Sequence, residues 1–127
     1  MLALLLAVTA GVQAQGLVAG AKLERSLTST NAVTLVTRST RVFTVFVQNT
    51  SASDLWLHVY DGTSTPANGT RPSLSAVKVL AGTGGGYDFG TYGAPFGTGV
   101  TVLTSTTDLT LTNSSASFDV TVIHTPR

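Results

Sequence analysis

Two histidines and six carboxylates are the residues of this chain whose chemistry suits proton transfer or metal binding. A metal site takes several ligands that converge from close positions, and neither His58 nor His124 has such neighbours along the sequence. The chain contains no cysteine, which excludes disulfides, thiolate ligands and cysteine nucleophiles. The sequence therefore predicts neither a metal site nor a bound cofactor.

The acidic residues are the candidates for acid–base catalysis, and a glycosidase needs only two of them at a suitable separation. Three of the six, Asp54, Asp61 and Asp108, lie in predicted turns, where Asp is favoured because it bonds to nearby backbone groups. A hydrolase would need acids such as Asp61, Asp88 and Asp119 to converge in one cleft. The structural role in turns is the favoured interpretation.

Two motifs of enzymes are missing from the sequence. No Gly-x-Ser-x-Gly elbow is present. The glycine run at residues 82–86 lacks the Lys-Ser/Thr pair and the helix of a phosphate-binding loop, so a hairpin turn is expected there. We therefore expect a protein that binds or assembles and is not an enzyme.

Aromatic residues provide the candidate binding surface. Trp56, His58 and Tyr60 alternate along one face of a predicted strand at residues 55–60. Exposed aromatic faces of β-sandwiches anchor protein interfaces or stack on sugar rings. We expect these three residues, together with Phe96, at a core or subunit interface, and keep a sugar platform as the alternative.

The segment at residues 61–73 is a long loop rich in turn-forming residues. It contains Pro66, Asn68-Gly69, Arg71 and Pro72. Its length indicates a crossover between sheets or an exposed recognition loop. Pro66, Asn68 and Arg71 are its candidate exposed residues.

Strands must position these residues, because the apolar residues recur with a period of two from residue 31 onward. Residues 41–49 are apolar on both faces, with Phe43, Val45 and Val47 on one side, so a central strand is expected. The polar link at residues 49–54 predicts a hairpin with the strand at 55–60. About eight short strands are expected, at residues 32–37, 41–49, 55–60, 74–80, 87–89, 100–105, 109–111 and 118–123.

This spacing predicts an all-β fold, a β-sandwich or jelly-roll-like domain of short antiparallel strands spanning residues 31–127. Charged residues make up 10% of the 127-residue chain and the net charge is +1. Nucleic-acid binding, which requires clustered Lys and Arg, is therefore not expected.

Residues 1–30 form an apolar N-terminal segment with more than one interpretation. Residues 2–10 and the Val12-Gln13-Ala14 sequence are typical of a secretory signal, although no Lys or Arg precedes the apolar run. The run is shorter than the roughly 20 residues that span a bilayer, so no membrane association is expected of the mature form. The other interpretations are an arm that docks on a partner subunit and a wrongly assigned start.

Several turn and strand motifs follow one another in a set order between residues 42 and 106. They are Asn49-Thr50, the strand from Leu55 to Asp61, the loop from Thr65 to Gly69, Pro72, Asp88-Phe89-Gly90 and the segment from Phe96 to Val100. In this order they resemble a group of small structural proteins of tailed bacteriophages and prophages. The resemblance implies a β-sandwich virion component, such as a capsid-decoration, head-fibre or tail-associated subunit, and brings no active-site residues with it.

Two functions of different classes follow from the sequence. The first is a virion structural protein that associates with itself and with other virion proteins. The second is a secreted or periplasmic module that binds a glycan or a surface, with Trp56 or Tyr92 stacking on sugar and the signal cleaved after Ala14.

Overall fold

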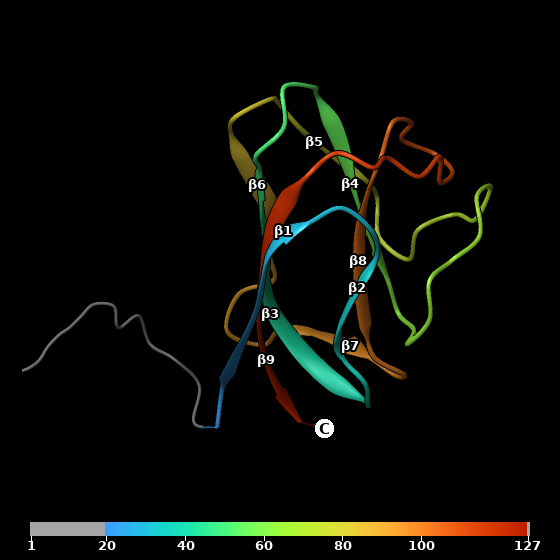
Figure 1. Ribbon diagram of the computed structural model, residues 1–127. Coiled ribbons are helices and arrows are strands. Elements are labelled where there is room, and N and C mark those ends of the chain that lie inside the picture. The colour runs from blue at the N-terminus through green and yellow to red at the C-terminus, as the bar shows by residue number, and fades with distance from the viewer. Residues whose placement is uncertain (1–19, 127) are drawn as a thin grey trace, which may run out of the picture.

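The computed structural model describes residues 20–126, which form nine strands and no helix (Figure 1). Consequently, this part of the chain has no helix of the length and hydropathy needed to cross a membrane. The strands are β1 (Lys22–Ser29), β2 (Val33–Val36), β3 (Thr40–Asn49), β4 (Leu55–Tyr60), β5 (Val77–Val79), β6 (Gly84–Asp88), β7 (Ala94–Phe96), β8 (Val100–Ser105) and β9 (Phe118–Pro126). The expected all-β class is confirmed.

The strands form two antiparallel sheets, as Figure 1 shows. Sheet A has the order β1-β9-β3-β6, and the short β7 pairs with β3 next to β6. Sheet B has the order β2-β8-β4-β5. When β7 is set aside, the pairing is nested: β1 pairs with β9, β2 with β8, β3 with β6, and β4 with β5.

The core lies between the two sheets and is built from alternate residues of their strands. Valine dominates it, because a β-branched side chain suits a pleated surface. Its buried members are Val36, Val42, Val45, Val47, Leu57, Val59, Val79, Phe96, Val100, Val102, Phe118, Val120 and Val122.

The sandwich begins earlier than the expected boundary at residue 31. Lys22–Ser29 forms β1, an edge strand whose residues pair with β9 from Lys22↔His124 to Ser29↔Phe118. The separation into segments 1–30 and 31–127 is therefore wrong for residues 22–29, where charged residues between the leucines obscure the strand pattern. The signal-like run and its cleavage site lie outside the described residues.

The expected hairpin between β3 and β4 is wrong, because β3 belongs to sheet A and β4 to sheet B. The connection is shaped by Asn49, which is fully buried. Its Nδ2 donates to the carbonyl oxygens of Ser53 (2.7 Å) and Val79 (3.1 Å). Its Oδ1 accepts from the backbone N–H and the hydroxyl of Ser51. Asn49 thus ties the end of one sheet to β5 of the other.

β3 is central, as expected, but its two faces are not those that strict alternation predicts. The pairing with β9 shifts between Val42↔His124 and Thr44↔Ile123, which makes Phe43 the extra residue of a bulge. Val42 therefore faces the core with Val45 and Val47, in place of Phe43.

Three of the expected local elements differ from the structure. The strand expected at 74–80 is limited to Val77–Val79. The glycines expected to form a turn are largely strand, since Gly84–Asp88 forms β6. Residues 109–111 are not a strand, because the backbone of Leu111 pairs instead with the loop at Gly69 and Thr70.

Candidate functional site

The outer face of sheet B is covered by two loops, residues 61–76 and 106–116, which lie on the right of Figure 1. Their backbones bond to each other, since Gly69 N donates to Leu111 O and Leu111 N donates to Thr70 O, both at 2.8 Å. Asn113 N donates to Asn68 Oδ1 at 2.9 Å. Under these loops Tyr60, Leu103 and Leu111 form a second, smaller core.

These loops and the core bury three of the four residues that were expected at an interface. His58 is fully buried and Tyr60 is 6% exposed, both beneath the loops, so neither is available to a partner. Phe96 is 2% exposed and belongs to the core between the sheets. Only Trp56, at the margin of the cover, keeps part of its side chain accessible.

The loop at residues 61–73 does not cross between the sheets, because β4 and β5 are neighbours in sheet B. Asn68 and Arg71 are exposed, as expected, and Pro66 is half-buried. The side chain of Asn68 is used to hold the second loop, whereas Arg71 borders a pocket.

His58 links both covering loops to β4. Its Nε2 donates to the carbonyl oxygen of Thr107 (3.0 Å), and its Nδ1 lies 3.1 Å from the Tyr60 hydroxyl. The same hydroxyl donates to the carbonyl oxygen of Thr70 at 3.3 Å. Desolvation by burial lowers the pKa of His58, outweighing the raising effects of the backbone at Thr107 and Asp108 and of the Asp108 charge.

Stability should therefore depend on pH through His58. Because its folded-state pKa lies below the ordinary 6.5, the unfolded chain binds more protons than the folded chain as the pH falls below 6.5. We expect the free energy of unfolding to fall there, by about 1.4 kcal/mol for each unit that separates the two pKa values. Urea unfolding of the wild type and of His58→Gln, from about pH 7 to about pH 4, measures this effect.

Glutamine keeps an N–H donor for Thr107 but does not titrate. The stability advantage of the wild type over His58→Gln should thus shrink as the pH falls. An advantage that stays constant across this range would contradict a buried neutral imidazole at His58.

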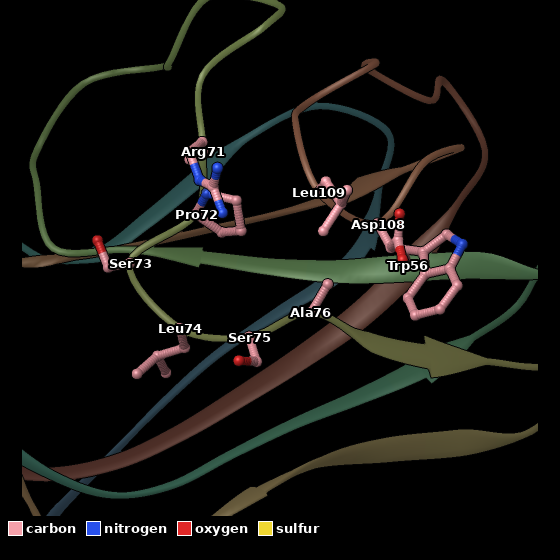
Figure 2. Close-up of a pocket in the computed structure, with 9 residues that line it drawn as sticks. All are labelled: Trp56, Arg71, Pro72, Ser73, Leu74, Ser75, Ala76, Asp108 and Leu109. Carbon is pink, nitrogen blue, oxygen red and sulfur yellow. The ribbon is translucent and has the colours of Figure 1, made fainter.

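Trp56 forms one wall of a surface pocket of about 330 Å3 (Figure 2). The segment from Arg71 to Ala76 runs along one side of β4, and Asp108 and Leu109 enter from the other loop. The pocket therefore combines an indole, an aliphatic side chain, a guanidinium, a carboxylate and serine hydroxyls. It brings together Trp56 and Arg71, which the sequence placed in two unrelated candidate sites.

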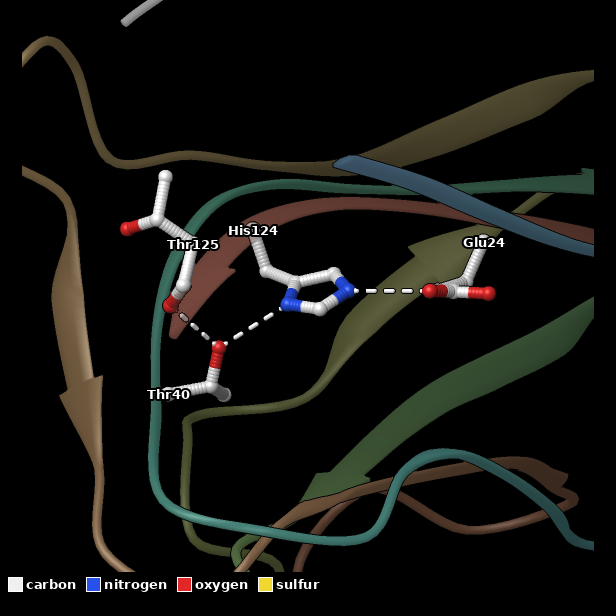
Figure 3. Close-up of polar contacts among 4 residues, drawn as sticks. All are labelled: Glu24, Thr40, His124 and Thr125. Atoms are coloured by element: carbon white, nitrogen blue, oxygen red, sulfur yellow. Dashed lines mark hydrogen bonds and ion pairs between the residues drawn. The ribbon is translucent and has the colours of Figure 1, made fainter. Parts of the chain in front are cut away.

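A second polar arrangement joins β1, β3 and β9 and resembles a catalytic triad in outline (Figure 3). Nδ1 of His124 lies 3.0 Å from Thr40 Oγ1, and Nε2 lies 3.2 Å from Glu24 Oε2. A small pocket of about 170 Å3 is lined by Glu24, His124 and residues 35–38.

The direction of the hydrogen bonds shows that this arrangement does not activate a nucleophile. Thr40 Oγ1 donates its proton to the carbonyl oxygen of Thr125 at 2.7 Å, so it accepts from Nδ1 of His124. Thr40 is also fully buried. Through its contacts with Thr40 and Glu24, His124 thus links three adjacent strands of sheet A.

The three acids considered for hydrolysis are held at three different backbone positions. Asp61 accepts hydrogen bonds from the N–H groups of Gly97, Thr98 and Gly99. Asp88 accepts from Gly90 N, and Asp119 accepts from Thr28 N. Asp61 and Asp88 thus shape loops, as expected for Asp, whereas Asp119 lies within β9 and holds Thr28 at the bulge of β1.

No group of three or more His, Asp or Glu side chains in the described part of the chain is arranged to hold a metal ion. No family model, curated protein or solved structure matches the chain.

Sequence reasoning missed how the pocket is assembled. Asp108 and Leu109 were expected in a turn and a strand, and no short motif connects them with Trp56 or with residues 71–76. The only available signal was the length of the loop at 61–73, which exceeds that of an ordinary connection.

Proposed function

We propose that this chain is a non-enzymatic structural protein of a tailed-bacteriophage virion that acts by protein–protein assembly. Its partners are copies of itself and other virion proteins, and its place is that of a capsid-decoration, head-fibre or tail-associated subunit. The observation that carries the proposal is the exposed outer face of sheet A.

The nested pairing of the strands supports a jelly roll as the finer description of the sandwich. In a jelly roll a long antiparallel hairpin of eight strands folds over on itself. The first strand therefore pairs with the last, the second with the seventh, the third with the sixth and the fourth with the fifth. The pairs β1·β9, β2·β8, β3·β6 and β4·β5 follow this rule. Jelly rolls are the architecture of many viral capsid domains.

The outer face of sheet A has the character of an assembly surface. Leu23 on β1 is 60% exposed and Phe46 on β3 is 45% exposed. Between and beside them lie Ile123 of β9 and the glycines of β6, and the ring of Phe46 lies over Gly84. The residues that pair with Phe46, Gly86 of β6 and Thr121 of β9, carry no charge, and the cores of protein interfaces are depleted in charged residues.

Association through the outer face of sheet A is favoured over association through the free edge of β1. The pairing of β1 with β9 shifts between Ser26 and Ser29, and β1 carries Lys22 and Arg25. Bulges and charged residues on an edge strand oppose pairing with another chain.

The residues through which the sequence resembles phage structural proteins have structural roles in this fold. Asn49 fixes the crossover between the sheets, and Asp61 caps the loop at residues 97–99. Asp88 turns the chain at Gly90. The motifs thus specify a way of folding, which is what a family of structural proteins shares.

Native mass spectrometry of the full-length chain tests the assembly. We expect a discrete oligomer for the wild type and about a thirtyfold weaker association for Phe46→Asp, since a buried interface charge costs about 2 kcal/mol or more. Leu80→Asp is the matched control, because Leu80 is 52% exposed but lies in the turn after β5. It should leave the oligomer intact.

Mass spectrometry of density-purified virions from the natural host tests the location. The chain should be found in the particles at many copies. A wild type that is monomeric at all concentrations, or particles without the chain, would overturn the proposed function.

A further inference from the structure

We propose that the Trp56 pocket binds a pyranose ring of a glycan. This site goes beyond the proposed assembly function, because it lies on sheet B and its covering loops, whereas the assembly face lies on sheet A.

The indole of Trp56 supplies the platform for the sugar. Trp56 stands on β4 between Ser105 of β8 and Lys78 of β5, so its backbone is fixed on both sides. Its side chain is partly exposed, and Lys78 Nζ lies 6.0 Å from the ring centroid. The apolar C–H face of a pyranose buries well against an aromatic ring.

The remaining walls offer the polar groups that sugar hydroxyls require. Each hydroxyl donates and accepts a hydrogen bond. The Asp108 carboxylate is an acceptor, the Arg71 guanidinium is a donor, and the Ser75 hydroxyl can act in both directions. The Ser73 hydroxyl already accepts from Asp61 N at 2.9 Å and is left to donate. An indole beside such groups matches a ligand with one apolar face and a polar rim, and does not match a purely hydrophobic ligand.

The size and position of the pocket suit a single ring within a longer glycan. Its volume of about 330 Å3 is at the lower end of the roughly 300–1,000 Å3 of small-molecule sites. Arg71, Ser73, Ser75 and Asp108 are all exposed, so the pocket opens to solvent. A chain of further sugars can therefore leave the site without a clash.

The walls are held in place before any ligand binds. The loop that carries Asp108 is fixed at Thr107, whose carbonyl oxygen accepts from His58 Nε2 and whose N–H donates to Ser105 Oγ. The opposite wall is fixed at Ser73, whose N–H donates to Val59 O at 3.0 Å. Rigid walls lower the entropy lost on binding, which favours measurable affinity even for a small ligand.

Trp56 is the only tryptophan of the chain, so its fluorescence reports directly on the pocket. The probes are the methyl glycosides of glucose, galactose and mannose, N-acetylglucosamine and glucuronate, each titrated into the full-length protein. We expect a saturable shift of the emission with at least one of them, with a dissociation constant of about 1 mM, typical of a single weakly held ring.

Two variants distinguish binding in the Trp56 pocket from other causes of a change in emission. Asp108→Asn should weaken the binding about tenfold, because the carboxylate's charge-assisted hydrogen bond is lost. Tyr92→Ala should leave the binding unchanged, although Tyr92 is 87% exposed and is the residue that the sequence also offered for stacking on a sugar.

Either of two results would overturn the proposed site: emission that changes only linearly with every probe, or binding that Tyr92→Ala abolishes and Asp108→Asn leaves intact. The test is independent of assembly, because Phe46→Asp should bind the same probe with unchanged affinity even as a monomer.

Discussion

Replacing Asp61 with alanine is expected to lower the free energy of unfolding by about 2–3 kcal/mol. The carboxylate of Asp61 accepts three backbone hydrogen bonds, from Gly97 at 2.9 Å, Thr98 at 2.8 Å and Gly99 at 3.2 Å. Hydrogen bonds to a charged acceptor are each stronger than neutral ones. Water reaches this partly exposed loop and replaces some of the lost bonds, so the loss is smaller than the sum of three.

Urea unfolding followed by circular dichroism measures the effect. Asp54→Ala is the matched control, because Asp54 is also an exposed loop carboxylate but accepts only one backbone hydrogen bond, from Ala81 N at 2.9 Å. We expect that variant to lose about 1 kcal/mol or less. Equal losses in the two variants would show that the cluster of N–H groups around Asp61 adds nothing to stability.

The role of Asp61 shows how far the sequence alone leads. Its place in a turn follows from residue type, because Asp bonds readily to nearby backbone. Its partners, Gly97 to Gly99, are distant in sequence and meet it only after β4 and β8 pair through Val59↔Val102 and Tyr60↔Thr101. Local chemistry was therefore predictable, whereas the partner that completes it required the sheet topology.

The same limit explains the wrong expectations for the site. A period of two places Trp56, His58 and Tyr60 on one face, and they do share it. The period does not tell which faces are covered by loops. The polar residues that cover His58 and Tyr60 have no apolar period, and their contacts are made largely by backbone groups such as Thr70 O and Thr107 O.

The prediction of a hairpin between β3 and β4 was wrong for a related reason. A short polar link is equally compatible with a hairpin and with a passage from one sheet to the other. What distinguishes the two here is the buried amide of Asn49, which bonds to Val79 of the opposite sheet. Apolar period and residue type therefore predict the class of fold, and buried polar contacts decide the topology.

Gly86→Ala is expected to be among the most destabilising single changes, costing about 3 kcal/mol and about 10 °C of melting temperature. Gly86 lies in β6 opposite Phe46 of β3, and a Cβ at this position would stand 1.9 Å from the carbonyl oxygen of Val45. That oxygen belongs to the central strand of sheet A and cannot move away without disturbing the pairing of β3 with both β6 and β9. Thermal unfolding of the purified variant measures the loss.

Gly84→Ala is the control that isolates this cause, since Gly84 lies two residues earlier in the same strand. A Cβ there would stand 2.3 Å from Cζ of Phe46, which is the far end of an exposed side chain. Phe46 can rotate away, so we expect a loss of about 1 kcal/mol or less. Because both changes have the same effect on the entropy of the unfolded chain, a difference of about 2 kcal/mol between them measures the backbone collision alone. Equal losses would mean that β6 shifts freely against β3, and that the glycine run sets a turn and not a closely packed strand.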